Sequence, residues 1–257
     1  MDDYPGAAAA YSLRLLNTDY TGDAVLVRRA SDNATQNVGF VDGELDTDAL
    51  DTFCSGTDGF VATWFDQSGN SNDLTQSTAS AQPKIYDSAT GVITENSKPA
   101  IYTDGVVDFL KSPTLSLSNP NTQFFVLKNL PPNNHIGGIY DDFNPSPALI
   151  GQDSDNLRFF QGVGFSPSIP HNQNQILITV KSSTTGTDWA AFYNSNTVTN
   201  SGENVGTRIG SVISLGKRNV FLNPSINYFQ EYILYDTDET SNRTGIEDNI
   251  NNFYSIY

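Results

Sequence analysis

The chain has 257 residues, of which 29 are acidic and 13 are basic, so its formal net charge is −16. Affinity for nucleic acids and for anionic membrane surfaces depends on basic residues that neutralise phosphates, so this charge balance argues against both partners. Only 16% of the residues are charged. Much of the polar surface therefore comes from Asn, Ser, Thr and Gln, which suits a β-rich fold with many turns.

Cysteine content and targeting signals narrow the class further. Cys54 is the only cysteine, so no internal disulfide can form, and we expect a buried thiol that packs as a small hydrophobe. No apolar run approaches the ~20 residues of a membrane span. The acidic start at Met1–Pro5 differs from the basic start of a secretory signal. We therefore expect a protein that acts where it is made, or a domain cut from a longer chain.

The first predicted elements are short and separated by turns. Residues 7–16 fit either a helix by propensity or a first strand with one apolar face. Strands are predicted at 24–29 and 36–41. A short helix is predicted at 46–54, where Asp46 or Thr47 provides the N-cap.

We expect the rest of the chain to pack on the stretch 59–76. Residues 60–65 are mainly apolar, β-branched or aromatic, which predicts a strand buried on both faces. Residues 66–73 are mostly Asp, Asn, Ser and Gly, which favour a tight loop bonded to its own backbone. A core strand followed by such a loop predicts a chain reversal at the edge of a sheet.

Further strands are predicted as far as a closing helix. They fall at residues 83–86, 91–94, 99–102, 106–110, 122–127, 136–140, 148–151, 157–161, 175–181, 188–193, 208–215 and 226–235. The segments 129–147 and 162–174 are predicted as long loops, the first with a brief strand inside it. Apolar residues at helical spacing predict an amphipathic helix at 239–254. No linker or repeat divides the chain, so we predict a single domain over residues 1–257.

Several short motifs in the first half resemble one enzyme family. They are Ala10-Tyr11-Ser12, Tyr20-Thr21-Gly22, Val27-Arg28-Arg29, Ser31-Asp32, Phe53-Cys54, Asp66-Gln67-Ser68-Gly69-Asn70 and Leu74-Thr75-Gln76. Together they are similar to the start of the catalytic domain of α-L-arabinofuranosidase B, which is a concanavalin A-like sandwich. The strand order from residue 175 to 235 resembles laminin-G-like domains of the same architecture. These resemblances imply an all-β fold, a two-sheet concanavalin A-like jelly-roll sandwich with helices near 46–54 and 239–254.

The catalytic residues of this family are not matched position by position. Retaining glycosidases need two carboxyl groups ~5–5.5 Å apart. The resemblance implies one carboxylate within 156–161, where the chain reads Leu157-Arg158-Phe159-Phe160, and another after Leu215-Gly216, where Lys217-Arg218 stand. The disulfide partner that the family has shortly after Cys54 is also missing. These departures predict a protein that shares the scaffold and is not an enzyme, unless Glu231 and Asp188 form a carboxylate pair.

Aromatic side chains and long loops supply the candidate binding residues. Trp189, Tyr193, Tyr102 and Phe109 can form a platform on which a sugar ring stacks, or can pack in the core. Loops carry specificity on sandwich scaffolds, so the long loops are the other candidates, with an oligomer contact or plain surface as the alternative. The ligand-binding residues that we predict are Tyr140, Asp141, Asp142, Phe143, Phe165, Trp189 and Tyr193, with His135 beside them.

The loop after residue 65 also offers oxygen ligands for a metal. Asp66, Asn70, Asn72 and Asp73 can gather around Ca²⁺, a hard cation that takes 6–8 oxygen ligands. They can instead cap their own loop through side-chain-to-backbone hydrogen bonds. The spacing fits no defined calcium motif, so no cofactor is predicted and Ca²⁺ stays the one candidate.

These observations together predict a non-catalytic virion protein. We expect a phage tail, fibre or head-decoration protein that binds a glycan or other virion proteins, with a homo-oligomer as its assembly. Its predicted location is the virion, assembled in bacterial cytoplasm, with the extracellular space or a cell surface as the alternative. Two further functions stay open, since a fold by itself licenses no activity. They are a glycoside hydrolase of the α-L-arabinofuranosidase type and a secreted polysaccharide-binding module.

Overall fold

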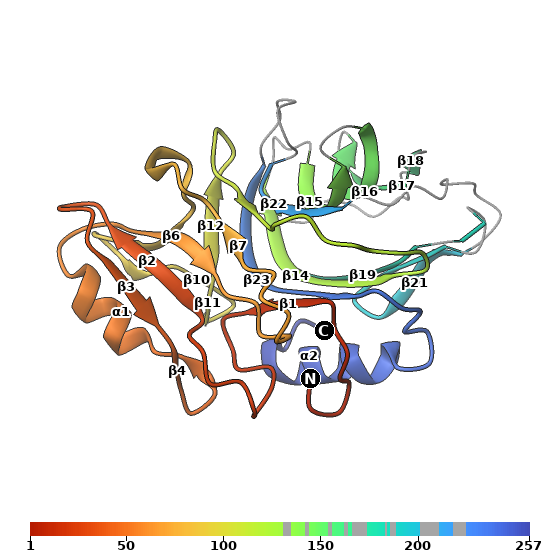
Figure 1. The fold of residues 1–257 in the computed structure, drawn as a ribbon, viewed down its shortest axis with the longest axis horizontal. Helices are drawn as coiled ribbons and strands as arrows, with labels where there is room; N and C mark the ends of the chain where they lie inside the picture. The colour runs from red at the N-terminus through yellow and green to blue at the C-terminus, as the bar shows by residue number, and fades with distance from the viewer. Residues whose placement is uncertain are drawn as a thin grey trace.

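Figure 1 shows a computed structural model of the chain. It describes all residues except 131–134, 142–143, 154–155, 162–163, 166–173, 183, 186–188, 201–210 and 218–224. Within 135–165 it describes the backbone of the strands, and the side chains at 136–139, 157 and 159. The described elements are mostly antiparallel strands, with two α-helices, so the prediction of an all-β sandwich is confirmed. Neither helix is long and apolar enough to cross a membrane.

The strands form two layers that diverge from one edge of β6 (Gly59–Trp64). The C-terminal end of β6 pairs with β7, and its N-terminal end pairs with β8. From β7 the pairing continues through β13, β22, β15, β16, β17 and β18, and from β8 it continues through β12, β23, β14, β19, β20 and β21. Figure 1 shows β22, β15 and β16 above the long arc of β14 and β19.

The strands of these two layers have the following bounds. The layer that starts at β7 contains β7 (Leu74–Thr75), β13 (Leu110–Lys111), β22 (Val212–Leu215), β15 (His135–Asp141), β16 (Asn144–Asp153), β17 (Asn156–Gln161) and β18 (Gly164–Phe165). The layer that starts at β8 contains β8 (Lys84–Asp87), β12 (Ile101–Asp104), β23 (Ile226–Tyr235), β14 (Thr122–Leu130), β19 (Gln175–Lys181), β20 (Ala190–Tyr193) and β21 (Asn196–Asn200).

Shorter elements complete the fold. The other edge of β6 carries β2 (Val25–Arg29) and β3 (Thr35–Val38), and β1 (Ala9–Ser12) lies beside β23. Two small hairpins pair β4 (Phe40–Val41) with β5 (Glu44–Leu45), and β10 (Thr94–Glu95) with β11 (Lys98–Pro99), while β9 (Gly91–Val92) pairs with β8. Residues 79–81 form one turn of 3₁₀-helix.

β23 is the strand around which the lower layer is built. One edge of β23 pairs with β14 along its whole length, with a bulge between Val126 and Leu127. The other edge pairs with β12 at Ile226–Phe229 and with β1 at Glu231–Leu234, so β12 and β1 lie end to end. Its alternating apolar side chains face the space between the layers on one side and α2 on the other.

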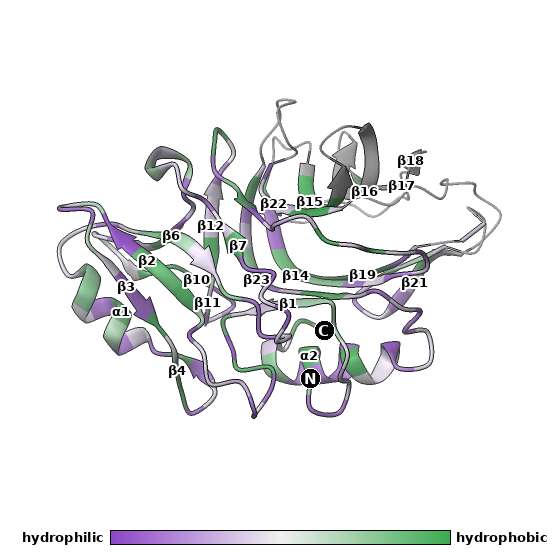
Figure 2. Cartoon of the chain, viewed as in Figure 1, coloured by the Kyte–Doolittle hydropathy of each residue, from purple (hydrophilic) through white to green (hydrophobic). Residues whose placement is uncertain are grey.

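Two hydrophobic cores result from this arrangement. The larger core lies inside the sandwich and includes Trp64, Phe125 and Tyr232, all fully buried. The smaller core lies between the lower layer and α2 (Arg243–Tyr254), and there Phe124 and Ile233 meet Ile250. Figure 2 shows α2 under the sheet with its hydrophobic residues in one stripe. This stripe is the amphipathic pattern that the sequence predicts, and the helix starts four residues later than predicted.

The short helix α1 (Thr47–Cys54) matches its prediction within a residue. Asp46 is its N-cap, and the Asp46 side chain accepts a hydrogen bond from the Ala49 N–H at 2.9 Å. Leu50 and Cys54 on its inner face are fully buried, and burial raises the pKa of the Cys54 thiol to about 11. A thiol with so high a pKa is a poor nucleophile, so Cys54 serves packing.

The loop after β6 is held by the carboxylate of Asp66, which is 4% exposed. Its Oδ1 accepts hydrogen bonds from the Ala10 N–H at 2.8 Å and the Ser68 N–H at 2.9 Å. Its Oδ2 accepts from the Ser68 hydroxyl and from the Asn72 N–H at 3.0 Å. The loop is therefore organised by one side chain that also reaches across to β1. The side chain of Gln67 extends this link, because it bonds the Leu16 N–H and two carbonyls of the β1 segment.

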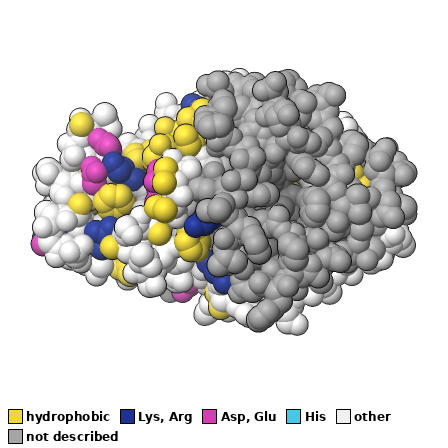
Figure 3. All heavy atoms as spheres, turned by 90° about the horizontal axis from the view of Figure 1, so that it is seen from above, with side chains coloured by type: hydrophobic (Ala, Val, Ile, Leu, Met, Phe, Trp, Pro, Cys, Tyr) yellow, Lys and Arg dark blue, Asp and Glu magenta, His cyan; other side chains and the backbone are white. Residues whose placement is uncertain are grey.

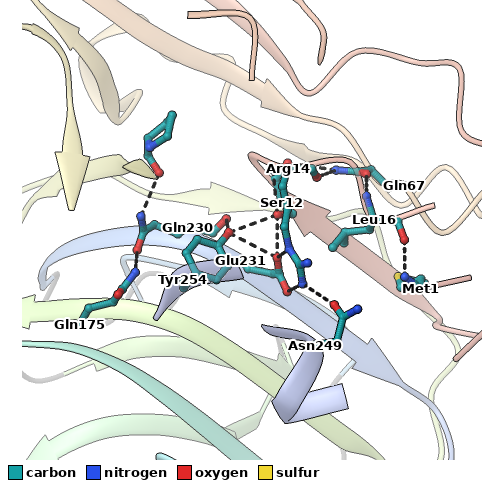
Figure 4. Close-up of polar contacts among 11 residues, drawn as sticks. Met1, Ser12, Arg14, Leu16, Gln67, Gln175, Gln230, Glu231, Asn249 and Tyr254 are labelled. Atoms are coloured by element: carbon teal, nitrogen blue, oxygen red, sulfur yellow. Dashed lines mark hydrogen bonds and ion pairs between the residues drawn. The ribbon is translucent and has the colours of Figure 1, made fainter. Parts of the chain in front are cut away.

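A buried ion pair joins the N-terminal segment to β23 and α2 (Figure 4). Arg14 Nε lies 2.8 Å from Glu231 Oε2, and Arg14 Nη2 lies 3.0 Å from Glu231 Oε1, which makes the pair bidentate. Ser12 donates to the same carboxylate at 2.8 Å, and Asn249 of α2 accepts from Arg14 Nη2 at 2.9 Å. Glu231 is therefore fully engaged by neighbours in the interior. Asp188 is outside the described ranges, so the carboxylate pair of Glu231 with Asp188 stays a prediction.

The structure corrects four predicted elements. β6 is buried on one face only, because Phe60, Ala62 and Thr63 are half-exposed. The strand expected at 106–110 is a turn, and only its last residue enters β13. The strand expected at 36–41 divides into β3 and β4. Most of the expected loop 129–147 is strand, since β14 runs to Leu130 and β15 and β16 form a hairpin.

Replacing Asp66 with Ala should strongly destabilise the fold. The variant leaves the buried N–H groups of Ala10 and Asn72 without their acceptor, which should lower the free energy of unfolding by ~3 kcal/mol. Urea denaturation followed by tryptophan fluorescence measures this. Asp19→Ala, at an exposed site in a turn, is the matched control and should change stability little. Equal midpoints for the two variants would contradict the role given to Asp66.

Removing one partner of the buried ion pair should destabilise the fold more than removing both partners. Glu231→Gln leaves the guanidinium of Arg14 buried without a counter-charge and should cost ~3 kcal/mol of unfolding free energy. The double change Arg14→Met with Glu231→Leu should cost less than either single change, because no charge is then left unpaired. Denaturant titrations of Arg14→Met, Glu231→Leu and the double variant measure the coupling energy between the two residues. A double variant as unstable as the sum of both single changes would contradict this account.

Candidate functional site

A tight turn after β12 brings two carboxyl groups together at the open end of the sandwich. Asp104 Oδ1 accepts hydrogen bonds from the N–H groups of Val106 at 2.7 Å, Val107 at 3.1 Å and Asp108 at 3.3 Å. Gly105 has a φ of +71°, which suits glycine. The Asp104 side chain therefore shapes the turn, and this local bonding is why residues 106–110 do not extend as a strand.

Asp108 is the chemically unusual member of this turn. Its side chain is 6% exposed, and its Oδ2 accepts a hydrogen bond from the Asp104 N–H at 3.1 Å. Burial, and then the negative charge of Asp104, raise the pKa of Asp108 to about 7. A carboxyl group with this pKa is partly protonated near neutral pH, so it can donate or accept a proton in a reaction.

The turn lies against the end of β22. A Cβ placed on Gly216, whose φ is +91°, would lie 2.8 Å from the Asp108 carbonyl oxygen and 2.8 Å from Thr103 Cγ2. Only glycine fits this close approach. The resemblance discussed above implies a catalytic carboxylate just after Gly216, where this chain has Lys217. The backbone of Asp108 therefore packs against this strand end.

A cleft of about 510 Å³ begins at Phe109, the residue after Asp108 in the chain. Phe109 lines it, and the Lys217 ammonium lies 5.6 Å from the centre of the Phe109 ring. The rest of the lining is mostly polar and comes from the loop after β6, β7 and β13, namely Ser71, Asp73, Thr75, Gln76, Ser77, Lys111, Ser112 and Pro113. One aromatic ring among many hydroxyl, amide and charged groups is a lining that suits a sugar.

The aromatic platform suggested by the sequence is not assembled as one surface. Trp189 is 2% exposed and packs against Phe159 in the core, with ring centres 6.3 Å apart. Tyr193 lies partly buried on β20, paired with Ile178 of β19. Trp189 therefore packs in the core, which was the alternative to stacking on a sugar, because protein covers its ring. Phe109 lines the cleft, and Tyr102 is half-exposed on β12.

The side chains of the loop residues predicted to bind a ligand lie outside the part of the chain that the structure describes. The backbones of Tyr140, Asp141 and His135 lie in β15, and that of Phe165 lies in β18, but their side chains are outside the described residues. Asp142 and Phe143 are outside the described ranges altogether. Their role stays a prediction.

The candidate calcium ligands are bonded to their own loop. Besides the four hydrogen bonds to Asp66, Asp73 Oδ1 accepts from the Asp66 N–H at 2.8 Å. The Asn70 and Asn72 amides donate to the carbonyls of residues 7 and 8. Among the residues that the structure describes, no three His, Cys, Asp or Glu side chains converge as metal ligands. Binding of Ca²⁺ stays untested.

Sequence reasoning missed Asp108. The signal was present in the spacing of Asp104-Gly105-Val106-Val107-Asp108, since Asp-Gly favours a turn over a strand. Val106 and Val107 favour a strand, and for that reason a strand was predicted, although Val106 is 66% exposed and does not face the core.

With this geometry in place, comparison with known proteins gives a consistent result for the first half of the chain. The family model "Alpha-L-arabinofuranosidase B, catalytic" matches residues 2–107. A probable α-L-arabinofuranosidase B of Aspergillus terreus is 40% identical over 74 residues, which is 28% of this chain and 15% of the relative. The α-L-arabinofuranosidase B of Emericella nidulans is 40% identical over 74 residues, 28% of this chain and 14% of the relative. The chain thus matches about one seventh of each of these relatives.

Solved structures of similar fold extend the likeness to most of the chain. An arabinofuranosidase complexed with arabinofuranosyl-α-1,2-xylobiose superposes with a TM-score of 0.65 and 16% identity, over 94% of this chain and 62% of that one. An α-L-arabinofuranosidase soaked with a cyclic sulfate inhibitor gives a TM-score of 0.67 and 18% identity over the same shares. At this identity the likeness shows a shared β-sandwich fold. The first-half resemblance read from the sequence motifs is therefore confirmed.

These matches contradict the predicted function. The curated relatives reported above carry the name α-L-arabinofuranosidase B, and the matched family model describes a catalytic domain. The predictions of a non-catalytic virion or adhesion protein, of virion partners and of a chain that is not an enzyme are therefore wrong. They relied on the absence of carboxylates at two positions, which does not exclude acidic residues from other parts of the chain.

The raised pKa of Asp108 makes a prediction about stability. Between the ordinary pKa of 3.8 and about 7, this carboxyl is protonated in the folded state and ionised in the unfolded state. Ionisation then favours unfolding, so stability should fall as pH rises through this range. Asp108→Asn, which stays neutral, should gain a few degrees in Tm relative to the wild type between pH 4 and pH 8. Thermal denaturation measures it, and a difference in Tm that does not vary with pH would contradict the shift.

Proposed function

We propose that this chain is a glycoside hydrolase domain that removes α-L-arabinofuranosyl groups from glycans. The observation that carries the proposal is the match of residues 2–107 to the catalytic family model, together with relatives 40% identical over 74 residues. The matched stretch includes the loop of Asp66 and ends at the turn that holds Asp108. The matched curated relatives are arabinofuranosidases, and one similar structure contains an arabinofuranosyl-substituted xylobiose.

The chemistry of the turn supports a proton donor at Asp108. Hydrolysis of a glycosidic bond needs one carboxylic acid that protonates the leaving oxygen and a second carboxylate that attacks or activates water. An acid must hold its proton near the working pH, which an ordinary Asp does not do. Burial and the neighbouring charge of Asp104 give Asp108 a pKa of about 7, so it meets this requirement.

Asp104 does not suit the second role. Its Oδ1 is already bonded to three backbone N–H groups of the turn, and moving it would open the turn. Asp108 is therefore the proposed acid. The second carboxyl group has to be identified by substituting the other acidic residues in turn, starting with Asp141 and Asp142.

The cleft next to Asp108 supports a sugar substrate. Phe109 offers an apolar ring at the cleft, and the side chains of Asp73, Thr75 and Lys111 offer groups that bond hydroxyls. Phe109 follows Asp108 directly in the chain, so the cleft adjoins the turn that holds the proposed acid.

Activity should depend on Asp108 more strongly with a poor leaving group than with a good one. Arabinofuranosyl-xylobiose needs protonation of its leaving oxygen, whereas 4-nitrophenyl α-L-arabinofuranoside releases a stable phenolate. Asp108→Asn should lower kcat/KM at least ~100-fold on the first substrate and much less on the second. The wild-type rate should fall as pH rises through about 7 as the acid loses its proton.

The controls separate the two parts of the proposal. Asp19→Asn, which changes an exposed carboxylate in the turn after residue 17, should leave both rates unchanged. Equal losses on both substrates for Asp108→Asn would remove Asp108 from the acid role and leave the hydrolase proposal standing. A wild-type chain that releases no arabinose from either substrate would overturn the proposed function.

A further inference from the structure

Six neighbouring strands place one side chain each in a continuous row. The strand register aligns Arg28 of β2 with Phe60 of β6, and Phe60 with Lys84 of β8. Lys84 is aligned with Tyr102 of β12, and Tyr102 with Tyr228 of β23. Tyr228 is aligned in turn with Lys128 of β14. The resulting row, called the cation–aromatic row below, is Arg28, Phe60, Lys84, Tyr102, Tyr228 and Lys128.

The members of the row contact one another in two groups, Arg28 with Phe60 and Lys84, and Tyr102 with Tyr228 and Lys128. The guanidinium of Arg28 lies 4.9 Å from the centre of the Phe60 ring, and Lys84 Nζ lies 5.9 Å from it. The rings of Tyr102 and Tyr228 lie 5.1 Å apart. Lys128 Nζ lies 5.5 Å from the Tyr228 ring. Cation–aromatic contacts at these distances hold side chains in place, so the rings are fixed before any ligand arrives.

The rings in the row are partly exposed to solvent. All six side chains are partly buried, whereas the residues next to them in the strands, such as Val61, Ile101 and Phe229, are fully buried in the core. Within the described part of the chain, the hydroxyls of Tyr102 and Tyr228 have no hydrogen-bond partner. Each tyrosine therefore offers an apolar ring and a free hydroxyl, the combination that recognises a molecule with both apolar and hydroxyl-bearing surfaces.

The charges in the row are compensated within the protein. Lys84 Nζ lies 2.8 Å from Asp58 and 3.1 Å from Asp87, and Lys128 Nζ lies 2.9 Å from Glu95. The two lysines thus face three carboxylates, whereas Arg28 donates to the neutral side chains of Gln82 and Asn33. Figure 3 shows the same mixture on the part of the surface seen from above that is over β2 and β6, where basic, acidic and hydrophobic side chains adjoin. With a chain charge of −16, such a surface attracts no polyanion, which leaves an uncharged ligand.

We propose that the cation–aromatic row binds a neutral polysaccharide chain along its length. Six adjacent strands span about 24 Å at the usual strand spacing, long enough for several sugar units. The rings of Phe60, Tyr102 and Tyr228 stack against sugar faces, and the tyrosine hydroxyls bond sugar hydroxyls. The choice of a plant-type glycan rests on the proposed function, but binding itself is measured without turnover, so the two proposals fail separately.

Affinity electrophoresis of the full chain, with soluble neutral xylan in the gel, measures whether the row binds a neutral polysaccharide. Tyr102→Ala combined with Tyr228→Ala should weaken binding about tenfold, as expected for two aromatic contacts. Tyr102→Phe with Tyr228→Phe keeps the rings and should lose less. Tyr257→Ala, which removes an exposed ring at the C-terminal end, is the matched control and should bind as the wild type does.

Further measurements test whether the ligand is uncharged. Binding to xylan should be the same at about 0.05 M and about 0.5 M NaCl, because no net charge is involved, and polygalacturonate should bind weakly or not at all. Thermal denaturation of each variant shows that it is folded, and the phenylalanine pair serves if the alanine pair does not fold. Failure of the wild type to bind xylan, equal loss in Tyr257→Ala, or salt-sensitive binding to polygalacturonate would each overturn the proposal.

Discussion

The carboxylate of Asp66 is the interaction on which the central part of this fold depends. It accepts four hydrogen bonds from three residues, and one of these bonds comes from the strand β1, more than fifty residues earlier in the chain. A buried charge can be kept only if such donors surround it. The loop after β6 and the path of β1 are therefore fixed together, and β1 is in turn the strand that completes one edge of β23.

This dependence explains which part of the sequence resembles the arabinofuranosidases. The motif Asp66-Gln67-Ser68-Gly69-Asn70 is bonded to the backbone of the same chain and builds the scaffold. The chemistry that we propose lies in Asp108, at the edge of the matched segment and against the end of β22. A motif of this kind therefore identifies a framework, and the reacting groups have to be found from the strands that the framework brings together.

Local structure could largely be predicted from the sequence, and the site could not. The α1 cap at Asp46, the long strand 226–235 and the amphipathic stripe of α2 depend on neighbours within a few residues, and their predictions hold. Residues 106–110 were predicted wrongly because valine favours strands, while the hydrogen bonds of Asp104 decided in favour of a turn. The pairing of Tyr102 with Tyr228, and the approach of Gly216 to Asp108, join residues more than one hundred positions apart. No local pattern contains such contacts.

The placement of β1 and β12 end to end against β23 has a consequence for how the molecule forms. β1 lies at residues 9–12, yet its partner lies at residues 231–234, so the first strand waits for almost all of the described chain to be synthesised before it can pair. Contacts between such distant segments are slow to form and leave edges open in the meantime. Synthesis of this protein thus leaves strand edges unpaired for a long interval, and a net charge of −16 makes neighbouring copies repel one another during that time.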